Sequence, residues 1–189
     1  MSRRVKIGVV GVGSLGQNHA RIYASLPEAE LIGVCDVDLA RAEKIASQYG
    51  TKAFASIDEL AGRVEALSVV VPTDKHREVA GRLIEKGLHL LVEKPIAATT
   101  AEAEELVALS QKKNVILQVG HIERFNPVMN FLEQLAKKPR FIEAHRLAPY
   151  PPPREGLLPR GTEVSVVLDL MIHDLEVILH LVGSPVWFW

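Results

Sequence analysis

The sequence contains a single cysteine, Cys35, so no disulfide can form within the chain. Cys35 lies in an apolar stretch, which favours a small core residue over a nucleophile. No apolar run approaches the length of a membrane span, and the run after Arg3 and Arg4 is too short for a signal peptide. From these absences we predict a cytoplasmic protein with no membrane partner.

The sequence also lacks a strong excess of charge. Its 22 Lys and Arg residues nearly balance 23 Asp and Glu residues, giving a formal net charge of -1. Without a basic field the chain is poorly suited to nucleic acid, so we expect no nucleic-acid partner, and any anion must be recognised by a local site. Hydrophobic residues, by contrast, make up 48% of the 189 residues, which is enough for a packed core.

A glycine-rich turn near the N-terminus is the most informative motif. The apolar run 5–10 leads directly into it, and residues 19–23 continue with helical character. This pattern predicts a strand, a tight turn and a helix, as in dinucleotide-binding folds. Gly11 would allow the turn, Gly13 would admit a pyrophosphate close to the backbone, and Gly16 would let the helix pack on the strand. The residues expected at the phosphates are Gly11, Gly13, Ser14, Leu15 and Gly16.

A second apolar run, 31–35, ends in Asp36, at the distance expected for the acid that binds an adenosine ribose. A carboxylate there accepts hydrogen bonds from ribose hydroxyls and repels a 2′-phosphate, and Val37 and Asp38 follow it instead of an arginine. We therefore predict NAD as the cofactor in preference to NADP. The alternative is that Asp36 only starts a turn or caps the helix that begins near Asp38.

Apolar runs and helical spacings alternate along residues 1–119, which predicts parallel βαβ units. The fold class expected is α/β, with a Rossmann-type doubly wound parallel sheet as an NAD-binding domain in residues 1–119. A partial α+β substrate and oligomerisation domain follows in residues 120–189, where the sequence becomes dense in polar and aromatic residues. Expected there are a helix from Asn126-Pro127 to about residue 138, a strand over 141–147, a proline-rich loop and a helix over 163–182.

Lys94 follows an apolar strand and precedes a proline, which places it at the carboxyl edge of the predicted sheet, where open α/β folds bind ligands. A positively charged nicotinamide nearby would lower the pKa of Lys94 toward a value useful for acid–base chemistry. The alternative is a surface lysine paired with Glu93.

Asp169 and His173 are four residues apart in the last predicted helix, so they should project from one face. They could act as a base with its orienting carboxylate, or as metal ligands joined by Glu176 or His180. An isolated pair of this kind is more often part of the edge of a core.

Together these motifs resemble the Gfo/Idh/MocA oxidoreductase family. The resemblance is carried by the glycine turn with His19, by Pro72-Thr73 followed by His76, by Glu93-Lys94-Pro95, and by Asp169 with His173. It implies an NAD(P)-dependent sugar or polyol dehydrogenase, and we expect no metal. It further implies Lys94 and His173 as the catalytic pair, Asp169 near the substrate hydroxyls, and Pro72, Thr73, His76 and Glu93 beside the cofactor.

Two stretches, 120–127 and 145–147, are most similar to the UDP-N-acetylglucosamine 3-dehydrogenase branch of that family. This similarity implies a sugar or nucleotide-sugar substrate that meets Arg124, Asn126 and Arg146. The diphosphate of a nucleotide sugar would suit the forked guanidinium of Arg124, Arg146 or Arg160.

Members of this family normally continue into a large antiparallel sheet that completes the substrate pocket and joins subunits. This sequence stops soon after the helix that carries Asp169 and His173. The resemblance therefore implies a C-terminally truncated member that forms a homo-oligomer. The alternative is a dinucleotide-binding fragment without turnover.

Overall fold

The computed structural model describes residues 3–135, 139, 141–147, 149 and 164–183. Contacts within the chain divide it into two units, residues 1–120 and residues 121–189, which we call the first and second unit. Each unit is described by itself.

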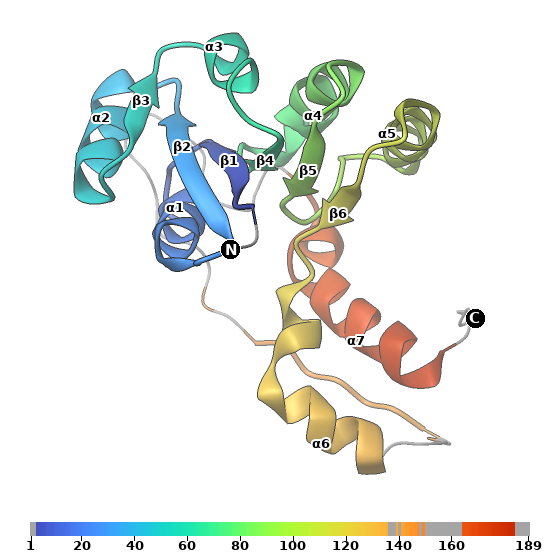
Figure 1. The fold of residues 1–189 in the computed structure, drawn as a ribbon. Helices are drawn as coiled ribbons and strands as arrows, with labels where there is room; N and C mark the ends of the chain where they lie inside the picture. Colours follow the sequence, from blue (N-terminus) through green and yellow to red (C-terminus); the bar gives the residue numbers. More distant parts are fainter. Residues whose placement is uncertain (1–2, 136–138, 140, 148, 150–163, 184–189) are drawn as a thin grey trace. The chain divides into compact units, whose positions relative to one another are not determined.

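The first unit is built on a six-stranded sheet in which every pairing is parallel, in the order β3-β2-β1-β4-β5-β6 (Figure 1). The strands are β1 Val5–Val10, β2 Ala29–Cys35, β3 Lys52–Phe54, β4 Ala66–Val69, β5 His89–Val92 and β6 Leu117–Val119. The helices are α1 Gly16–Ser25, α2 Leu39–Gln48, α3 Ile57–Ala61, η1 Thr73–Lys75, α4 His76–Glu85 and α5 Thr100–Lys113. This order, with a crossover beside β1, confirms the predicted doubly wound α/β fold.

Helices cover both faces of the sheet, and each face has its own apolar cluster. On one face α1 and α2 bury Ala20, Ala42 and Ile45 against Val9 and Val34 of the central strands. The other face holds α3, α4 and α5, and the residues that its cluster takes from these helices are Leu60, Ala61, Ala80, Leu83, Ile84 and Leu106. Strands buried on both faces read as continuous apolar runs, which is why the sequence marks them clearly.

Local sequence signals fix several helix ends. Asp38 and Ser56 cap α2 and α3 by accepting backbone N–H groups three residues ahead. Gly50 and Gly87 follow α2 and α4 with φ of +64° and +80°, conformations that favour glycine. The 3₁₀ turn η1 leads directly into α4.

The second unit contains η2 Ile122–Phe125, α6 Pro127–Leu135, the π-helical turn η3 Val167–Met171 and α7 Ile172–Val182. The helix start predicted at Pro127 is confirmed. The strand predicted over 141–147 is wrong, because the described residues there form no ladder, and a lone extended segment gains no stability without partner strands. The proline-rich loop and most of the last seven residues, as well as Arg160, lie outside the described residues.

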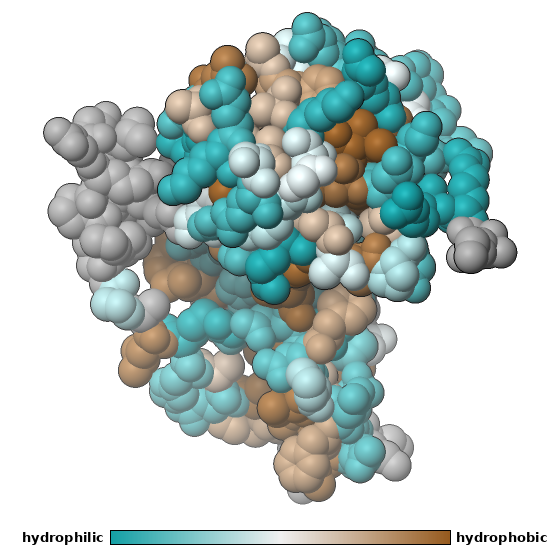
Figure 2. All heavy atoms as spheres, turned by 60° about the vertical axis from the view of Figure 1, so that its left-hand side comes forward, coloured by the Kyte–Doolittle hydropathy of each residue, from teal (hydrophilic) through white to brown (hydrophobic). Residues whose placement is uncertain are grey.

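Apolar side chains are exposed on α6 and the turn before it. Phe125, Val128, Phe131 and Leu135 are all more than half exposed. Figure 2 shows hydrophobic spheres between hydrophilic ones on the face that it presents.

Candidate functional site

The candidate residues of the first unit follow the carboxyl ends of parallel strands. Gly11 follows β1, Asp36 follows β2, Pro72 comes after β4, and Glu93 follows β5. Because all strands run the same way, these ends meet at one edge of the sheet (Figure 1). The edge is held together beyond the strands, since the Gly11 N–H donates to the Cys35 carbonyl at 2.8 Å.

The glycine turn is tight against the sheet and open on its other side. Gly11 has φ of +85°, and a Cβ added to it would collide with the Val70 carbonyl. A Cβ on Gly16 would collide with the Gly11 carbonyl. A Cβ on Gly13, in contrast, would meet no atom within 4 Å. The turn therefore leaves backbone accessible at Gly13, where a pyrophosphate would have to approach.

The N-terminus of α1 is suited to an anion. No side chain caps it and its first turn carries no acidic residue, so the positive end of the helix dipole favours a phosphate there. The N–H groups of Gln17 and Asn18 already donate to the Gly13 and Leu15 carbonyls, which leaves the anion to the turn before them. The Ser14 carbonyl accepts from the side-chain amides of Gln17 and Asn18, each at 3.3 Å, which steadies the turn. Leu15 is exposed at the helix start.

The Asp36 carboxylate stabilises the glycine turn through a hydrogen bond. Its Oδ2 accepts from the Val12 N–H at 2.8 Å, and its Oδ1 accepts from the Asp38 N–H at 3.0 Å and from Arg41 Nη1 at 3.3 Å. Its side chain is only 5% exposed. A carboxylate has about four acceptor positions, so one remains on Oδ2 for a ribose hydroxyl. The turn-forming role and the ribose role are thus compatible.

The sequence analysis missed Arg41, which also lies 3.1 Å from Asp38. It lies five residues beyond Asp36, in the first turn of α2, and not directly after the acid. An i, i+3 pairing with the capping Asp38 was the signal available. Its guanidinium places a cation next to the position predicted to exclude a 2′-phosphate.

Pro72 and Thr73 lie at the start of η1, and His76 begins α4. His76 is only 1% exposed, with Nδ1 2.7 Å from the Pro95 carbonyl and Nε2 2.9 Å from the Val71 carbonyl. It therefore joins the loop after β4 to the loop after β5. Its predicted place beside the cofactor stays a prediction, since in this structure both ring nitrogens face backbone carbonyls.

Glu93 and Lys94 lie where β5 ends, and both are half-buried. Glu93 Oε1 is 2.9 Å from His19 Nε2, and Oε2 accepts from the Lys94 N–H at 3.2 Å. Burial raises the pKa of Glu93, but the hydrogen bond and charge of His19, with the amide and charge of Lys94, outweigh burial and lower it. A fixed carboxylate thus stands beside Lys94 at the sheet edge.

Asp169 and His173 belong to the second unit and Lys94 to the first, so the predicted catalytic pair spans the two units. Asp169 lies in η3 and His173 in α7, and both are half-buried. A π-helical turn is wider than an α-helical turn, but residues four apart still lie about one turn apart, so the shared face of Asp169 and His173 stays a prediction. Periodicity alone could not reveal the π-helical turn.

The predicted substrate residues of the second unit bind carboxylates on α7. Arg124 Nε donates to Glu176 at 2.6 Å, and Arg146 Nε donates to both oxygens of Asp174 at 3.1 Å. The hydrogen bond to Asp174 is the main reason that the pKa of Arg146 is raised. Asn126 caps α6 by accepting from the Val128 N–H at 3.1 Å.

The alternative hypothesis, in which Asp169 and His173 bind a metal together with Glu176 or His180, has no support among the described residues. His180 pairs with Glu133 of α6 at 2.7 Å, and Glu176 pairs with Arg124. Within those residues, no three His, Cys, Asp or Glu side chains are grouped so as to hold a metal ion.

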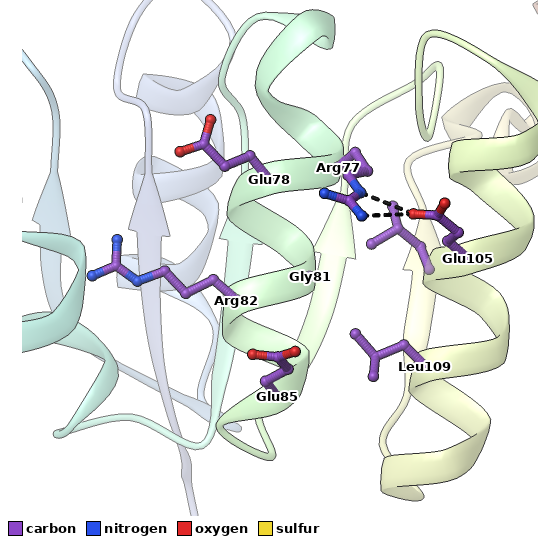
Figure 3. A pocket seen from close by; sticks show the side chains of 8 residues that line it. Arg77, Glu78, Gly81, Arg82, Glu85, Glu105 and Leu109 are labelled. Atoms are coloured by element: carbon purple, nitrogen blue, oxygen red, sulfur yellow. Dashed lines mark hydrogen bonds and ion pairs between the residues drawn. The ribbon is translucent and has the colours of Figure 1, made fainter.

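Two surface grooves lie elsewhere in the first unit. One, of about 240 Å³, lies between α4 and α5, where Arg77 points across to Glu105 and donates to it at 2.8 and 3.0 Å (Figure 3). The other, of about 690 Å³, includes Lys6, Glu30 and Lys52, which lie near the amino ends of their strands. Neither groove is lined by the candidate residues, so the site rests on the arrangement of the carboxyl edge.

No helix in the described part of the chain has the length and apolar character needed to cross a bilayer.

Residues 5–121 match a protein family described as an oxidoreductase family with an NAD-binding Rossmann fold. Over 181 residues the chain is 40% identical to UDP-N-acetylglucosamine 3-dehydrogenase of Acidithiobacillus ferrooxidans, covering 95% of this chain and 55% of that protein. A solved structure of that enzyme superposes with a TM-score of 0.86 at 39% identity, covering 97% of this chain and 58% of the other.

The structure is also similar to GenD2 from gentamicin A biosynthesis, solved in complex with NAD, with a TM-score of 0.82 and 25% identity. That match covers 98% of this chain and 56% of GenD2. The chain thus spans about half the length of the relatives that it matches.

Proposed function

The chain belongs to the Gfo/Idh/MocA family of oxidoreductases, and from this membership we propose that it transfers a hydride between a sugar hydroxyl carbon and a nicotinamide. The observation that carries the proposal is the glycine turn, which is closed against the sheet at Gly11 and Gly16 and open at Gly13. Lys94 lies at the same sheet edge, two strands away from the turn.

The residues at the edge fit a dinucleotide. Gly13 and the N-terminus of α1 would hold the pyrophosphate, and Asp36 would accept from the adenosine ribose. Pro72, Thr73 and Glu93 would lie beside the nicotinamide, with His76 holding the loops that carry them. We propose NAD in preference to NADP, because a 2′-phosphate would approach the anionic Asp36.

Lys94 and His173 are the proposed acid–base residues. One of them removes the proton from the sugar hydroxyl, and Asp169 orients the substrate hydroxyls. Hydride acceptance from the adjacent carbon is the chemistry that a bound nicotinamide supplies. The carboxylate of Glu93 keeps the backbone of Lys94 in place through the amide hydrogen bond.

A nucleotide sugar is the proposed substrate class, supported by the 40% identity to an enzyme named for UDP-N-acetylglucosamine. Arg124, Asn126 and Arg146 remain its proposed contacts. A diphosphate would share these guanidinium groups with Glu176 and Asp174, which already bind them. The proposed homo-oligomer would cover exposed apolar side chains of α6 such as Phe131. The cytoplasmic location stays a prediction.

A second candidate is dinucleotide binding without turnover. It is favoured by coverage, because the described chain contains the whole parallel sheet but the match covers only 55% of the UDP-N-acetylglucosamine 3-dehydrogenase. Reduction of NAD upon addition of UDP-N-acetylglucosamine distinguishes the candidates, because binding alone produces no absorbance of the reduced nicotinamide.

Calorimetric titration with NAD tests the proposed site. We expect saturable binding by the natural chain and at least about tenfold weaker binding by Gly13→Ala, because the new methyl would occupy the face left for the pyrophosphate. The free energy of unfolding should stay within about 1 kcal/mol, since that methyl meets no protein atom. The outcome against the proposal is unchanged NAD affinity in Gly13→Ala.

Asp36→Asn tests the cofactor preference. Removing the charge should shift the ratio of NADP to NAD affinity toward NADP by about tenfold or more, because repulsion disappears and Arg41 is released to meet a 2′-phosphate. The matched control is Asp38→Asn, which removes a charge paired with the same Arg41 and keeps a good helix cap. Equal shifts in both variants would show that net charge, and not Asp36, sets the preference.

A further inference from the structure

Four polar side chains form a continuous hydrogen-bonded chain between α1 and the end of β5. Tyr23 OH lies 2.7 Å from Ser68 Oγ, Ser68 Oγ lies 3.1 Å from His19 Nδ1, and His19 Nε2 lies 2.9 Å from Glu93 Oε1. Ser68 belongs to β4 and is completely buried. His19 and Tyr23 stand one turn apart on α1, the helix that follows the glycine turn. The chain therefore ends on the carboxylate beside Lys94.

The direction of the last hydrogen bond follows from the charge on Glu93. Its lowered pKa keeps the carboxylate ionised, so it can only accept, and His19 Nε2 must carry the proton. With an uncharged ring, Nδ1 accepts from Ser68, which then accepts from Tyr23. With a protonated ring, Ser68 turns and donates to Tyr23. In both states the Nε2–H of His19 points at Glu93.

Glu93 has little freedom to move. Its Oε1 accepts a hydrogen bond from His19 Nε2, and its Oε2 accepts one from the Lys94 N–H. On a third side stands Gly120, where an added Cβ would lie only 3.1 Å from Glu93 Oε1. The carboxylate is thus packed closely against residue 120, and a methyl group there would require it to shift by a few tenths of an ångström. Ser68 and Tyr23 fix the imidazole that holds it.

We propose that His19 is a positioning residue which fixes the Glu93 carboxylate at the cofactor edge, and that this fixed anion favours the oxidised, positively charged nicotinamide over the reduced one. The inference rests on the proposed function, which places the nicotinamide at this edge. A nearby anion attracts the positively charged oxidised ring and interacts weakly with the neutral reduced ring. Displacing the anion should therefore weaken the binding of NAD and leave the binding of NADH nearly unchanged.

The test is calorimetric binding of NAD and NADH to the natural chain, His19→Asn and His19→Gln. The shorter Asn reaches Ser68 but not Glu93, whereas Gln can place an amide N–H where Nε2 stands. We expect the preference for NAD over NADH to fall about three- to tenfold in His19→Asn and to return within about twofold in His19→Gln. If His19→Asn weakened the binding of NAD and of NADH equally, His19 would have only a structural role, and the proposal would be overturned.

Gly120→Ala is a second variant that leaves His19 untouched. Its methyl crowds the Glu93 carboxylate and shifts it by a few tenths of an ångström, so a smaller loss of NAD preference in the same direction is expected even if His19→Asn does not fold. An unchanged preference in a folded Gly120→Ala counts against the proposal. If the natural chain binds neither nucleotide, the proposed function itself fails. Binding of both with an unaltered ratio in every variant rejects only the inference about His19.

A readout without any nucleotide is the titration of the Glu93 carboxyl by carbon NMR, assigned with Glu93→Gln. Its pKa lies below the ordinary value of 4.5 in the natural chain and should rise in His19→Asn. The stabilisation by ionised Glu93 is present above the unfolded-state pKa and is lost as pH falls through the folded-state pKa. In His19→Asn the stabilisation should therefore be smaller, and its loss should be complete at a higher pH. An unchanged Glu93 titration would contradict the role of His19.

Discussion

Lys94→Ala is expected to lower kcat for oxidation of a nucleotide sugar by about 10²- to 10⁴-fold, the usual contribution of one general acid or base. The dissociation constant of NAD should change by no more than about twofold, because Lys94 is proposed to act on the sugar hydroxyl and not to bind phosphates. Steady-state kinetics and calorimetry on the same preparation give the two values.

Two further variants sharpen this expectation. Lys94→Arg keeps a cation but cannot give up its proton at working pH, so it should be nearly as inactive as the alanine variant. Lys86→Ala removes an exposed lysine that pairs with Asp58 at 3.3 Å, and it should leave kcat unchanged. Equal losses of NAD binding and catalysis in Lys94→Ala would remove Lys94 from the proposed chemistry.

Gly16→Ala is expected to lower the free energy of unfolding by about 3 kcal/mol, the upper end of the usual range for overpacking. The reason is that its Cβ would collide with the Gly11 carbonyl, a backbone atom that cannot rotate away as a side chain can. NAD binding should be lost as well, since the turn must open to admit the methyl.

Urea unfolding measures this effect, with Gly13→Ala as the matched control in the same turn. The two variants add the same methyl three residues apart, so only their surroundings differ. We expect a large fall in the unfolding midpoint for Gly16→Ala and little change for Gly13→Ala. Similar midpoints for both variants would contradict the packing described for the turn.

The parallel sheet could be predicted from the sequence because its signals are local. The central strands are buried on both faces, so they appear as apolar runs such as 66–71, and Gly11, Gly50 and Gly87 mark the turns between elements. The glycine turn and the end of β5 could be placed at one edge because parallel strands share their direction. Neither inference needed any knowledge of tertiary contacts.

What the sequence could not predict depends on partners that are distant or absent. Residues 141–147 have the composition of a strand, but no described segment pairs with them. The π-helical turn around Asp169 arises from a backbone register that apolar spacing does not encode. No local sequence pattern indicates that the Arg41 guanidinium donates to Asp36.

The hydrogen-bonded chain at Glu93 is an intermediate case. Ser68 is a polar residue inside an apolar run, and a buried hydroxyl requires a partner. That signal was readable, but the identity of its partners was not, because they come from α1, 45 and 49 residues earlier.

The packing of the glycine turn also sets the order in which the chain can mature during synthesis. Gly11 and Gly16 both pack against Val70, and the Gly11 N–H needs the carbonyl of Cys35. When the turn first emerges from the ribosome, neither neighbour has emerged with it. Residues 11–16 can therefore adopt their final conformation only after β4 has been synthesised. A nascent chain that is halted before Val70 contains the whole glycine motif but lacks the Val70 contacts against which it packs.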